Sequence, residues 1–130
     1  MQLSRYLDLY LTETQEHLRA LDRSLLQIEE TGERAALEEA FRSVHTIKGM
    51  SASMGFAAAA DLAHELEDRL DAVRQGRAAV DRDLIDALLE GADRLGRAVD
   101  HAVATQQGGL AEDDALEARA EAAIAVPVAG

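Results

Sequence analysis

The chain has 130 residues, which is enough for one domain with one hydrophobic core and too few for a nucleotide-binding catalytic domain joined to a substrate domain. Its 25 acidic and 13 basic residues give a net charge of −12, which argues against nucleic acid or a membrane as partner, because both are bound through basic surfaces, and favours a protein. Cysteine is absent, the amino terminus lacks the apolar run of a signal peptide, and no stretch of about 18 apolar residues occurs, so we expect a cytoplasmic chain without disulfides or thiolate metal sites.

The first predicted element is a long helix that ends at Thr31 and Gly32. Its core-facing side chains recur at intervals of three and four residues, which keeps them on one side of a helix. They are Leu7, Leu11, Thr14, Leu18, Leu21, Leu25 and Ile28. A second helix is predicted from about Glu33 to about Met54, with an apolar face of Leu37, Ala40, Phe41, Val44 and Ile47.

A turn at Gly55 leads into a third predicted helix, which should end near Gly76 because glycine suits the left-handed backbone that follows a helix. Its apolar stripe is Ala59, Leu62, Ala63, Leu66, Leu70 and Val73. Asp81 is the expected N-cap of a fourth helix. The apolar positions of that helix are Leu84, Ile85, Leu88, Leu89, Leu95, Val99 and Val103.

These patterns predict an all-α protein, since Pro127 is the only proline and no run of alternating β-branched residues marks a strand. Four amphipathic helices joined by short loops predict an antiparallel up-down four-helix bundle over residues 1–105. Residues 106–130 are expected to form a short fifth helix and a linker. In the first alternative "LAEDDALEARAEAAIA" docks on the bundle through Leu116 and Ile124; in the second it is a frayed, solvated segment, and "VPVAG" reads as linker in both.

The stretch "FRSVHTIKGMSASMGF" (41–56) holds the residues that point to chemistry. His45 falls at the edge of the apolar face of the second helix, and Lys48 lies one turn further on the same side. Gly49 and Ala52 leave that surface without bulky side chains, which predicts that a partner approaches closely there. Because the second and third helices are joined by a tight turn, Glu67 of the third helix is expected to reach His45.

This combination of groups suits phosphoryl transfer. A carboxylate that accepts a hydrogen bond from one imidazole nitrogen leaves the other nitrogen as the nucleophile, so Glu67 would select the tautomer of His45. The Lys48 ammonium would pair with phosphoryl oxygens. No metal site, nucleotide loop or second nucleophile is evident in the sequence, so we expect His45 to receive and give up a phosphoryl group without catalysing its own phosphorylation.

"HTIKG", "MSASMGF" and "LAHELED" together resemble the histidine phosphotransfer (HPt) domains, most closely the amino-terminal phosphotransfer domain of CheA-type chemotaxis histidine kinases. The resemblance implies that His45 is phosphorylated, and that Lys48, Gly49, His64 and Glu67 match residues of the family motif. It also implies an ATP-binding kinase domain, in cis or in trans, as donor and a CheY-like response regulator as acceptor. ATP and Mg²⁺ are then expected on those partner domains, with no cofactor bound by this one.

Alternatives remain open for several of these residues. Gly49 could serve helix packing, His64 could make a local hydrogen bond instead of tuning Glu67 or the phosphohistidine, and the Thr46 hydroxyl could bond its own backbone instead of orienting the site. A metal-binding bundle that uses His45, His64 and Glu67 is a different class of function, although it is short of ligands. A purely structural interaction bundle is a third.

Overall fold

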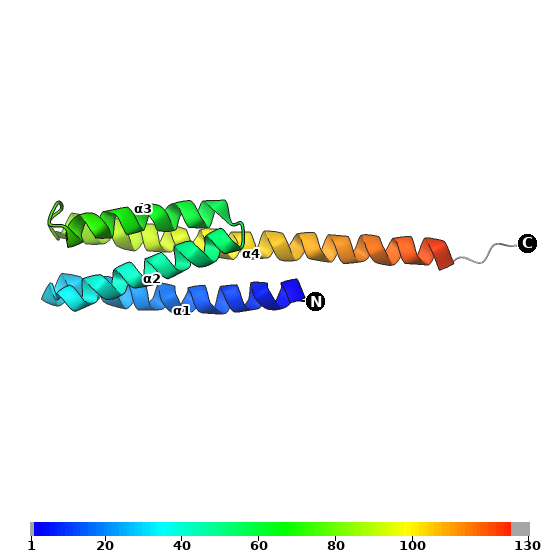
Figure 1. The fold of residues 1–130 in the computed structure, drawn as a ribbon, viewed down its shortest axis with the longest axis horizontal. Helices are drawn as coiled ribbons and strands as arrows, with labels where there is room; N and C mark the ends of the chain where they lie inside the picture. The colour runs from blue at the N-terminus through cyan, green and yellow to red at the C-terminus, as the bar shows by residue number, and fades with distance from the viewer. Residues whose placement is uncertain (1, 126–130) are drawn as a thin grey trace, which may run out of the picture.

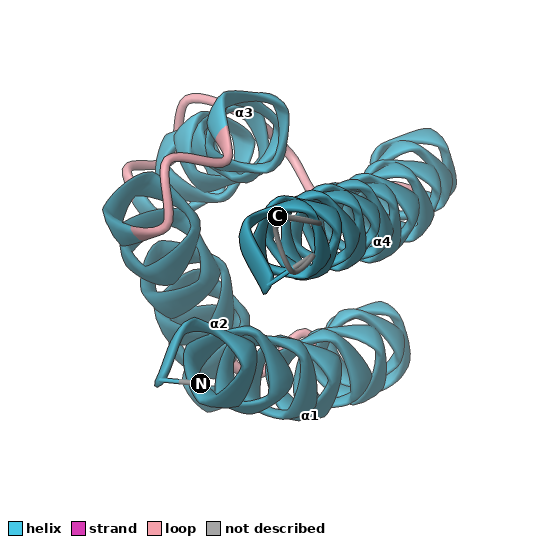
Figure 2. Cartoon of the chain, turned by 90° about the vertical axis from the view of Figure 1, so that its right-hand side faces the viewer, coloured by secondary structure: helices cyan, strands magenta, loops and turns pink. Residues whose placement is uncertain are grey.

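The computed structural model describes residues 2–125, and this part of the chain forms four helices and no strand. They are α1 (Gln2–Thr31), α2 (Arg34–Ser53), α3 (Ala57–Arg74) and α4 (Arg82–Ala125). α1 and α3 each pack against both α2 and α4. Successive helices run in opposite directions (Figures 1 and 2), so the predicted all-α, antiparallel up-down bundle is confirmed.

Local sequence signals place the ends of the helices. After α2 the Phe56 amide donates to the Ser51 carbonyl at 2.9 Å and the Gly55 amide to that of Ala52 at 3.0 Å, which is the hydrogen-bond pattern of a Schellman cap. The same pattern closes α3 around Gly76. Gly55 and Gly76 have φ of 75° and 73°, in the left-handed region that the prediction required.

The start of α4 follows the predicted cap. The Asp81 carboxylate accepts a hydrogen bond from the Leu84 amide at 2.8 Å, so it satisfies one of the amide groups that a helix leaves free in its first turn. The loop before it, from Gln75 to Asp81, brings the chain back along the bundle antiparallel to α3.

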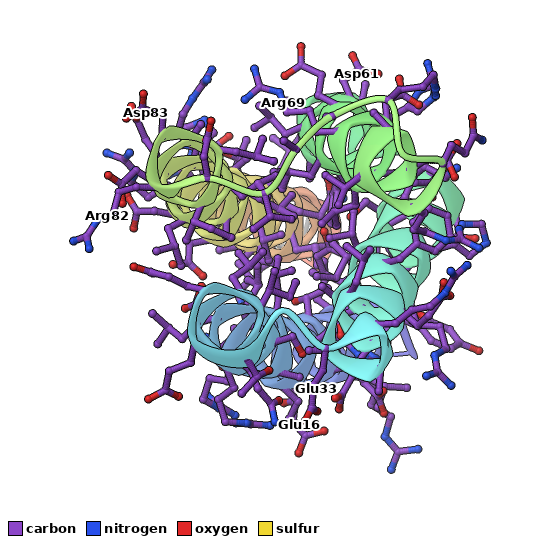
Figure 3. The ribbon with its side chains drawn as sticks, turned by 90° about the vertical axis from the view of Figure 1, so that its left-hand side faces the viewer. Glu16, Glu33, Asp61, Arg69, Arg82 and Asp83 are labelled. Atoms are coloured by element: carbon purple, nitrogen blue, oxygen red, sulfur yellow. The ribbon has the colours of Figure 1, made fainter. Side chains whose placement is uncertain are left out.

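The core lies between the four helices and is built from the predicted stripes. Its largest fully buried apolar side chains are Leu7, Leu21, Leu25, Val44, Ile47, Leu70, Ile85, Leu88, Leu95 and Val99. Charged side chains point outward from the bundle, as those labelled in Figure 3 show. The buried polar groups are partnered: Tyr10 and Ser51 share a hydrogen bond of 2.7 Å between α1 and α2, and the Thr14 hydroxyl donates to the Tyr10 carbonyl. No described helix carries an apolar stretch long enough to cross a membrane.

The prediction of a separate fifth helix is wrong for the described residues. α4 continues without a break through "TQQGG" to Ala125 and projects beyond the other three helices (Figure 1). Leu116 is 64% exposed and does not anchor a docked segment; the side chain of Ile124, like the linker residues 126–130, lies outside the described part.

The physical reason is helix elongation. The segment after Gly109 is rich in Ala, Glu and Leu, which are strong helix formers, and an existing helix extends without a new nucleus. Gly108 and Gly109 suggest a helix end in the sequence. Each destabilises the helix by only about 1 kcal/mol relative to alanine, which is too little to break it. The last buried side chain described in α4 is Val103.

Candidate functional site

The site lies where α2 and α3 pack side by side. His45 and Lys48 project from α2, and Glu67 projects from α3 between them. The Glu67 carboxylate accepts two hydrogen bonds: one oxygen is 2.7 Å from His45 Nδ1 and the other 2.8 Å from Lys48 Nζ. The predicted contact between Glu67 and His45 is therefore present, and it joins Lys48 to the same carboxylate.

Burial differs sharply among the three side chains. The Glu67 side chain is 13% exposed, that of Lys48 29% and that of His45 62%. Burial alone would raise the pKa of the Glu67 carboxyl, but the hydrogen bonds and charge interactions with Lys48 and His45 outweigh burial and hold this pKa below its usual value. Glu67 is thus an ionised, nearly enclosed acceptor, while the imidazole it holds is open to solvent.

This geometry specifies the tautomer of a neutral His45 imidazole. An ionised carboxylate can only accept a hydrogen bond, so His45 Nδ1 carries the hydrogen that it donates to Glu67. The lone pair of a neutral imidazole then resides on Nε2. Because the His45 side chain is mostly exposed, a nucleophilic nitrogen is presented to a reactant or partner that approaches from solvent.

Gly49 and Ala52 lie on the exposed surface of α2 near His45. A Cβ built on Gly49 would meet no atom within 4 Å, so this glycine does not serve helix packing within the bundle. The placement agrees with the predicted clearance for a partner, although the approach itself stays a prediction.

Two predicted supporting residues make local contacts. The Thr46 hydroxyl donates to the Arg42 carbonyl at 2.9 Å, which is the backbone bond named as its alternative. His64 Nε2 lies 3.5 Å from Asp68 Oδ1, with both side chains more than half exposed. In the described part of the chain His64 forms no hydrogen bond or ion pair with Glu67 or His45. The structure therefore brings together His45, Lys48 and Glu67 and leaves Thr46 and His64 outside that network.

The sequence reasoning missed a groove beside the histidine. An open apolar groove of about 610 Å³ runs between α1 and α2, and its lining includes His45, Gly49, Met50, Tyr6 and Leu9. Tyr6 and Leu9 are 58% and 56% exposed. They lie one turn apart on α1 and outside its predicted core positions. Two large apolar side chains on the face of a helix that does not enter the core were the sequence signal that could have identified the groove.

One further neighbour of the imidazole, and the residue that holds that neighbour, were also missed as site residues. The Phe41 ring stacks on the His45 ring, with centroids 6.1 Å apart and planes 13° apart, and the Arg74 guanidinium lies 4.1 Å from the centre of the Phe41 ring. Phe41 precedes His45 by four residues, a spacing at which side chains meet on a helix. That spacing was the available signal, but Phe41 had been assigned to the core face alone.

Comparisons with known proteins agree with this geometry. The family model described as Hpt domain matches residues 5–116. The chemotaxis protein CheA of Listeria monocytogenes is 51% identical over 83 residues, which are 63% of this chain and 13% of the relative. CheA of Halobacterium salinarum is 42% identical over 101 residues, 77% of this chain and 15% of the relative. The chain thus spans less than a sixth of the length of these relatives.

Two solved structures share the fold. The CheA phosphotransferase domain from Thermotoga maritima superposes with a TM-score of 0.71 at 40% identity and covers 77% of this chain and 96% of that one. The phosphorylated P1 domain of CheA3 from R. sphaeroides, solved in complex with CheY6, gives a TM-score of 0.73 at 28% identity and covers 89% and 95% of the two chains.

Proposed function

The chain belongs to the Hpt domain family, and from this we propose that it is a phosphohistidine carrier in chemotaxis-type two-component signalling, with His45 as the phosphorylated residue. The observation that carries the proposal is the solvent-exposed imidazole whose Nδ1 lies 2.7 Å from an ionised carboxylate that is only 13% exposed. The hydrogen bond at Nδ1 leaves Nε2 of this mostly exposed side chain as the nucleophile.

The transfer step follows from this arrangement. The Nε2 lone pair attacks the phosphorus of a donor, a nitrogen–phosphorus bond forms, and the bond from phosphorus to the leaving oxygen breaks with its electron pair on that oxygen. The ring acquires positive charge as Nε2 bonds to phosphorus while Nδ1 keeps its hydrogen. Glu67 stabilises that charge, in addition to selecting the tautomer. In the reverse sense the nitrogen–phosphorus bond breaks and the phosphoryl group moves to an acceptor carboxylate.

Lys48 has donors to spare for this chemistry. An ammonium carries three N–H donors, and the Lys48 contact with Glu67 uses one. With 29% of its side chain exposed, Lys48 can turn a second donor towards a phosphoryl oxygen on the neighbouring imidazole. We therefore assign it to stabilising the phosphoryl group as well as to holding Glu67.

Phosphoryl transfer at His45 needs a donor and an acceptor from other domains. The loops between the described helices contain no nucleotide-binding motif, and we propose that ATP is held by a histidine kinase domain in cis or in trans. The acceptor is a CheY-like receiver domain that supplies an aspartate and its Mg²⁺. The groove, whose lining includes Gly49, and the exposed Ala52 give it an approachable surface next to His45. One structural neighbour, crystallised with CheY6, is a precedent for such a partner. With these partners, the proposed location of the domain is the cytoplasm.

The alternatives find less support. A metal site would need His45, His64 and Glu67 to converge, but His64 lies beside Asp68. Among the described residues no group of three or more His, Cys, Asp and Glu side chains is placed to hold a metal ion. A purely structural bundle would not require an ionised glutamate to be enclosed beside an exposed imidazole.

Labelling with a phosphorylated donor tests the proposal. The protein is incubated with phosphoramidate, a small phosphoryl donor, or with a kinase domain of the CheA type, and bound phosphate is tested for the acid lability and base stability of phosphohistidine. His45→Gln should abolish labelling and leave helical content unchanged. His64→Gln is the matched control, because this histidine is equally exposed on the adjacent helix. Labelling that persists in His45→Gln would refute the assignment.

A further inference from the structure

An aromatic contact continues the site along α2 in the direction away from Lys48. The Phe41 ring is half-buried at the edge of the core and stacks on His45 with centroids 6.1 Å apart, within the range of favourable offset aromatic pairs. The planes of the two rings differ by 13°, so the phenyl face and the imidazole face are nearly parallel.

Phe41 is itself held from α3. The Arg74 guanidinium lies 4.1 Å from the centre of the phenyl ring, a cation–π contact. Arg74 Nε donates to Glu38 Oε1 at 3.1 Å, and its Nη1 lies 3.5 Å from Asp71 Oδ1. Arg74 follows Glu67 by seven residues and Glu38 precedes His45 by seven, so the Arg74–Glu38 pair repeats the α2–α3 pairing of the site two helical turns away.

The imidazole needs a second restraint. The orientation of the ring depends on two side-chain torsions, and the hydrogen bond from Nδ1 to Glu67 restrains only one distance, while 62% of the side chain is exposed. A contact with a ring face restrains the plane. Together the two contacts determine both the atom that faces Glu67 and the direction in which Nε2 points.

We infer that Phe41 is a positioning residue for phosphoryl transfer at His45, and that Arg74 supports it by holding the phenyl ring. The inference rests on the proposed function, since the reaction it serves is phosphorylation of Nε2. Phe41 acts through the imidazole and touches no reacting atom. Its contribution is to keep the reactive lone pair aimed at the incoming phosphorus, where misorientation lowers the fraction of productive encounters.

Variants separate this role from core packing. Phe41→Leu removes the aromatic face but keeps an apolar side chain, and Phe41→Tyr keeps the face. Phe56→Leu is the control, because Phe56 is the other phenylalanine, is also partly buried against the core, and packs on Tyr10 with centroids 5.1 Å apart rather than on the site. Labelling by phosphoramidate reports reactivity without any docking step, and the ¹⁵N shifts of the His45 ring report the tautomer populations.

We expect Phe41→Leu to slow labelling about two- to tenfold, the range that corresponds to losing an aromatic pair, and to raise the share of the tautomer with hydrogen on Nε2. Phe41→Tyr should restore both readouts, and Phe56→Leu should change neither. Wild-type rate and tautomer populations in Phe41→Leu would overturn the inference, as would an equal loss in Phe56→Leu.

Two outcomes need separate handling. If Phe41→Leu does not fold, Arg74→Gln replaces it, because this change keeps the phenyl ring and removes the cation that holds it; it should slow labelling about twofold, and an unchanged rate and tautomer would overturn the inference. If the wild-type protein is not labelled at all, the proposed function fails, and the ¹⁵N shifts of Phe41→Leu still decide whether Phe41 orients the ring.

Discussion

Replacing Glu67 by glutamine is expected to slow the phosphorylation of His45 more than replacing it by alanine, although glutamine is the closer match in shape. The Glu67 carboxylate accepts from Lys48 Nζ at 2.8 Å and from His45 Nδ1 at 2.7 Å. Glutamine offers one acceptor and one donor in the same place. Since an ammonium can only donate, the amide oxygen should face Lys48 and the amide nitrogen should face Nδ1.

That orientation reverses the tautomer. An amide N–H that points at Nδ1 requires a lone pair there, so the hydrogen moves to Nε2 and the nucleophile is lost. A hydrogen bond to a charged group contributes about 1.5–3 kcal/mol, and about 1.4 kcal/mol corresponds to a tenfold change. With Glu67 only 13% exposed, little of this is screened by solvent, so Glu67→Gln should be roughly 10- to 150-fold slower. Glu67→Ala forces neither tautomer and should retain more activity.

The assay is the initial rate of labelling by phosphoramidate, with ¹⁵N shifts of His45 to identify the tautomer. A second experiment places the same change in a Lys48→Met background, where the amide oxygen is free to accept from Nδ1–H. The glutamine substitution should then slow labelling by a smaller factor than it does beside Lys48. A rate for Glu67→Gln within twofold of wild type, or a lower rate for Glu67→Ala than for Glu67→Gln, would refute the tautomer argument.

Three other predictions test the surface, the titration and the cap. Gly49→Leu should fold, because a Cβ at this position meets no atom within 4 Å, and it should be labelled normally but fail to transfer the phosphoryl group to a cognate receiver. The control Arg19→Leu, at an exposed position of α1, should transfer normally. Normal transfer by Gly49→Leu would place the docking surface elsewhere. Folding lowers the pKa of Glu67 from 4.5, so its carboxylate stabilises the protein above that pH and loses this effect as the pH falls through the folded-state pKa. The difference in melting temperature between wild type and Glu67→Gln should therefore shrink below pH 4.5. A constant difference would contradict this. Asp81→Ala should lower the free energy of unfolding by about 1 kcal/mol in urea titrations through loss of the N-cap, while Asp86→Ala in the second turn should change it less.

The sequence by itself determined where the helices lie and how three of them begin or end. Apolar periodicity is a property of each segment alone, and the caps at Gly55, Gly76 and Asp81 act within a few residues of the chain. The spacing of His45, Lys48 and Gly49 on one helix follows from the same local geometry. The pattern of the sequence did not predict the continuation of α4 past residue 105. Gly108 and Gly109 signal a break there, but elongation of the existing helix overrides that signal.

Only the tertiary structure decided which side chains meet between helices. The sequence placed Glu67 near His45, but the packing of α3 on α2 sets the 2.7 Å contact, draws Lys48 to the same carboxylate and leaves His64 with Asp68. The same packing brings Arg74 over Phe41, and the pairing of α1 with α2 forms the groove. Such contacts depend on how two helices cross and in what register, and these are set by the whole core rather than by any one segment, so that residues distant in sequence acquire a common function only in the folded bundle.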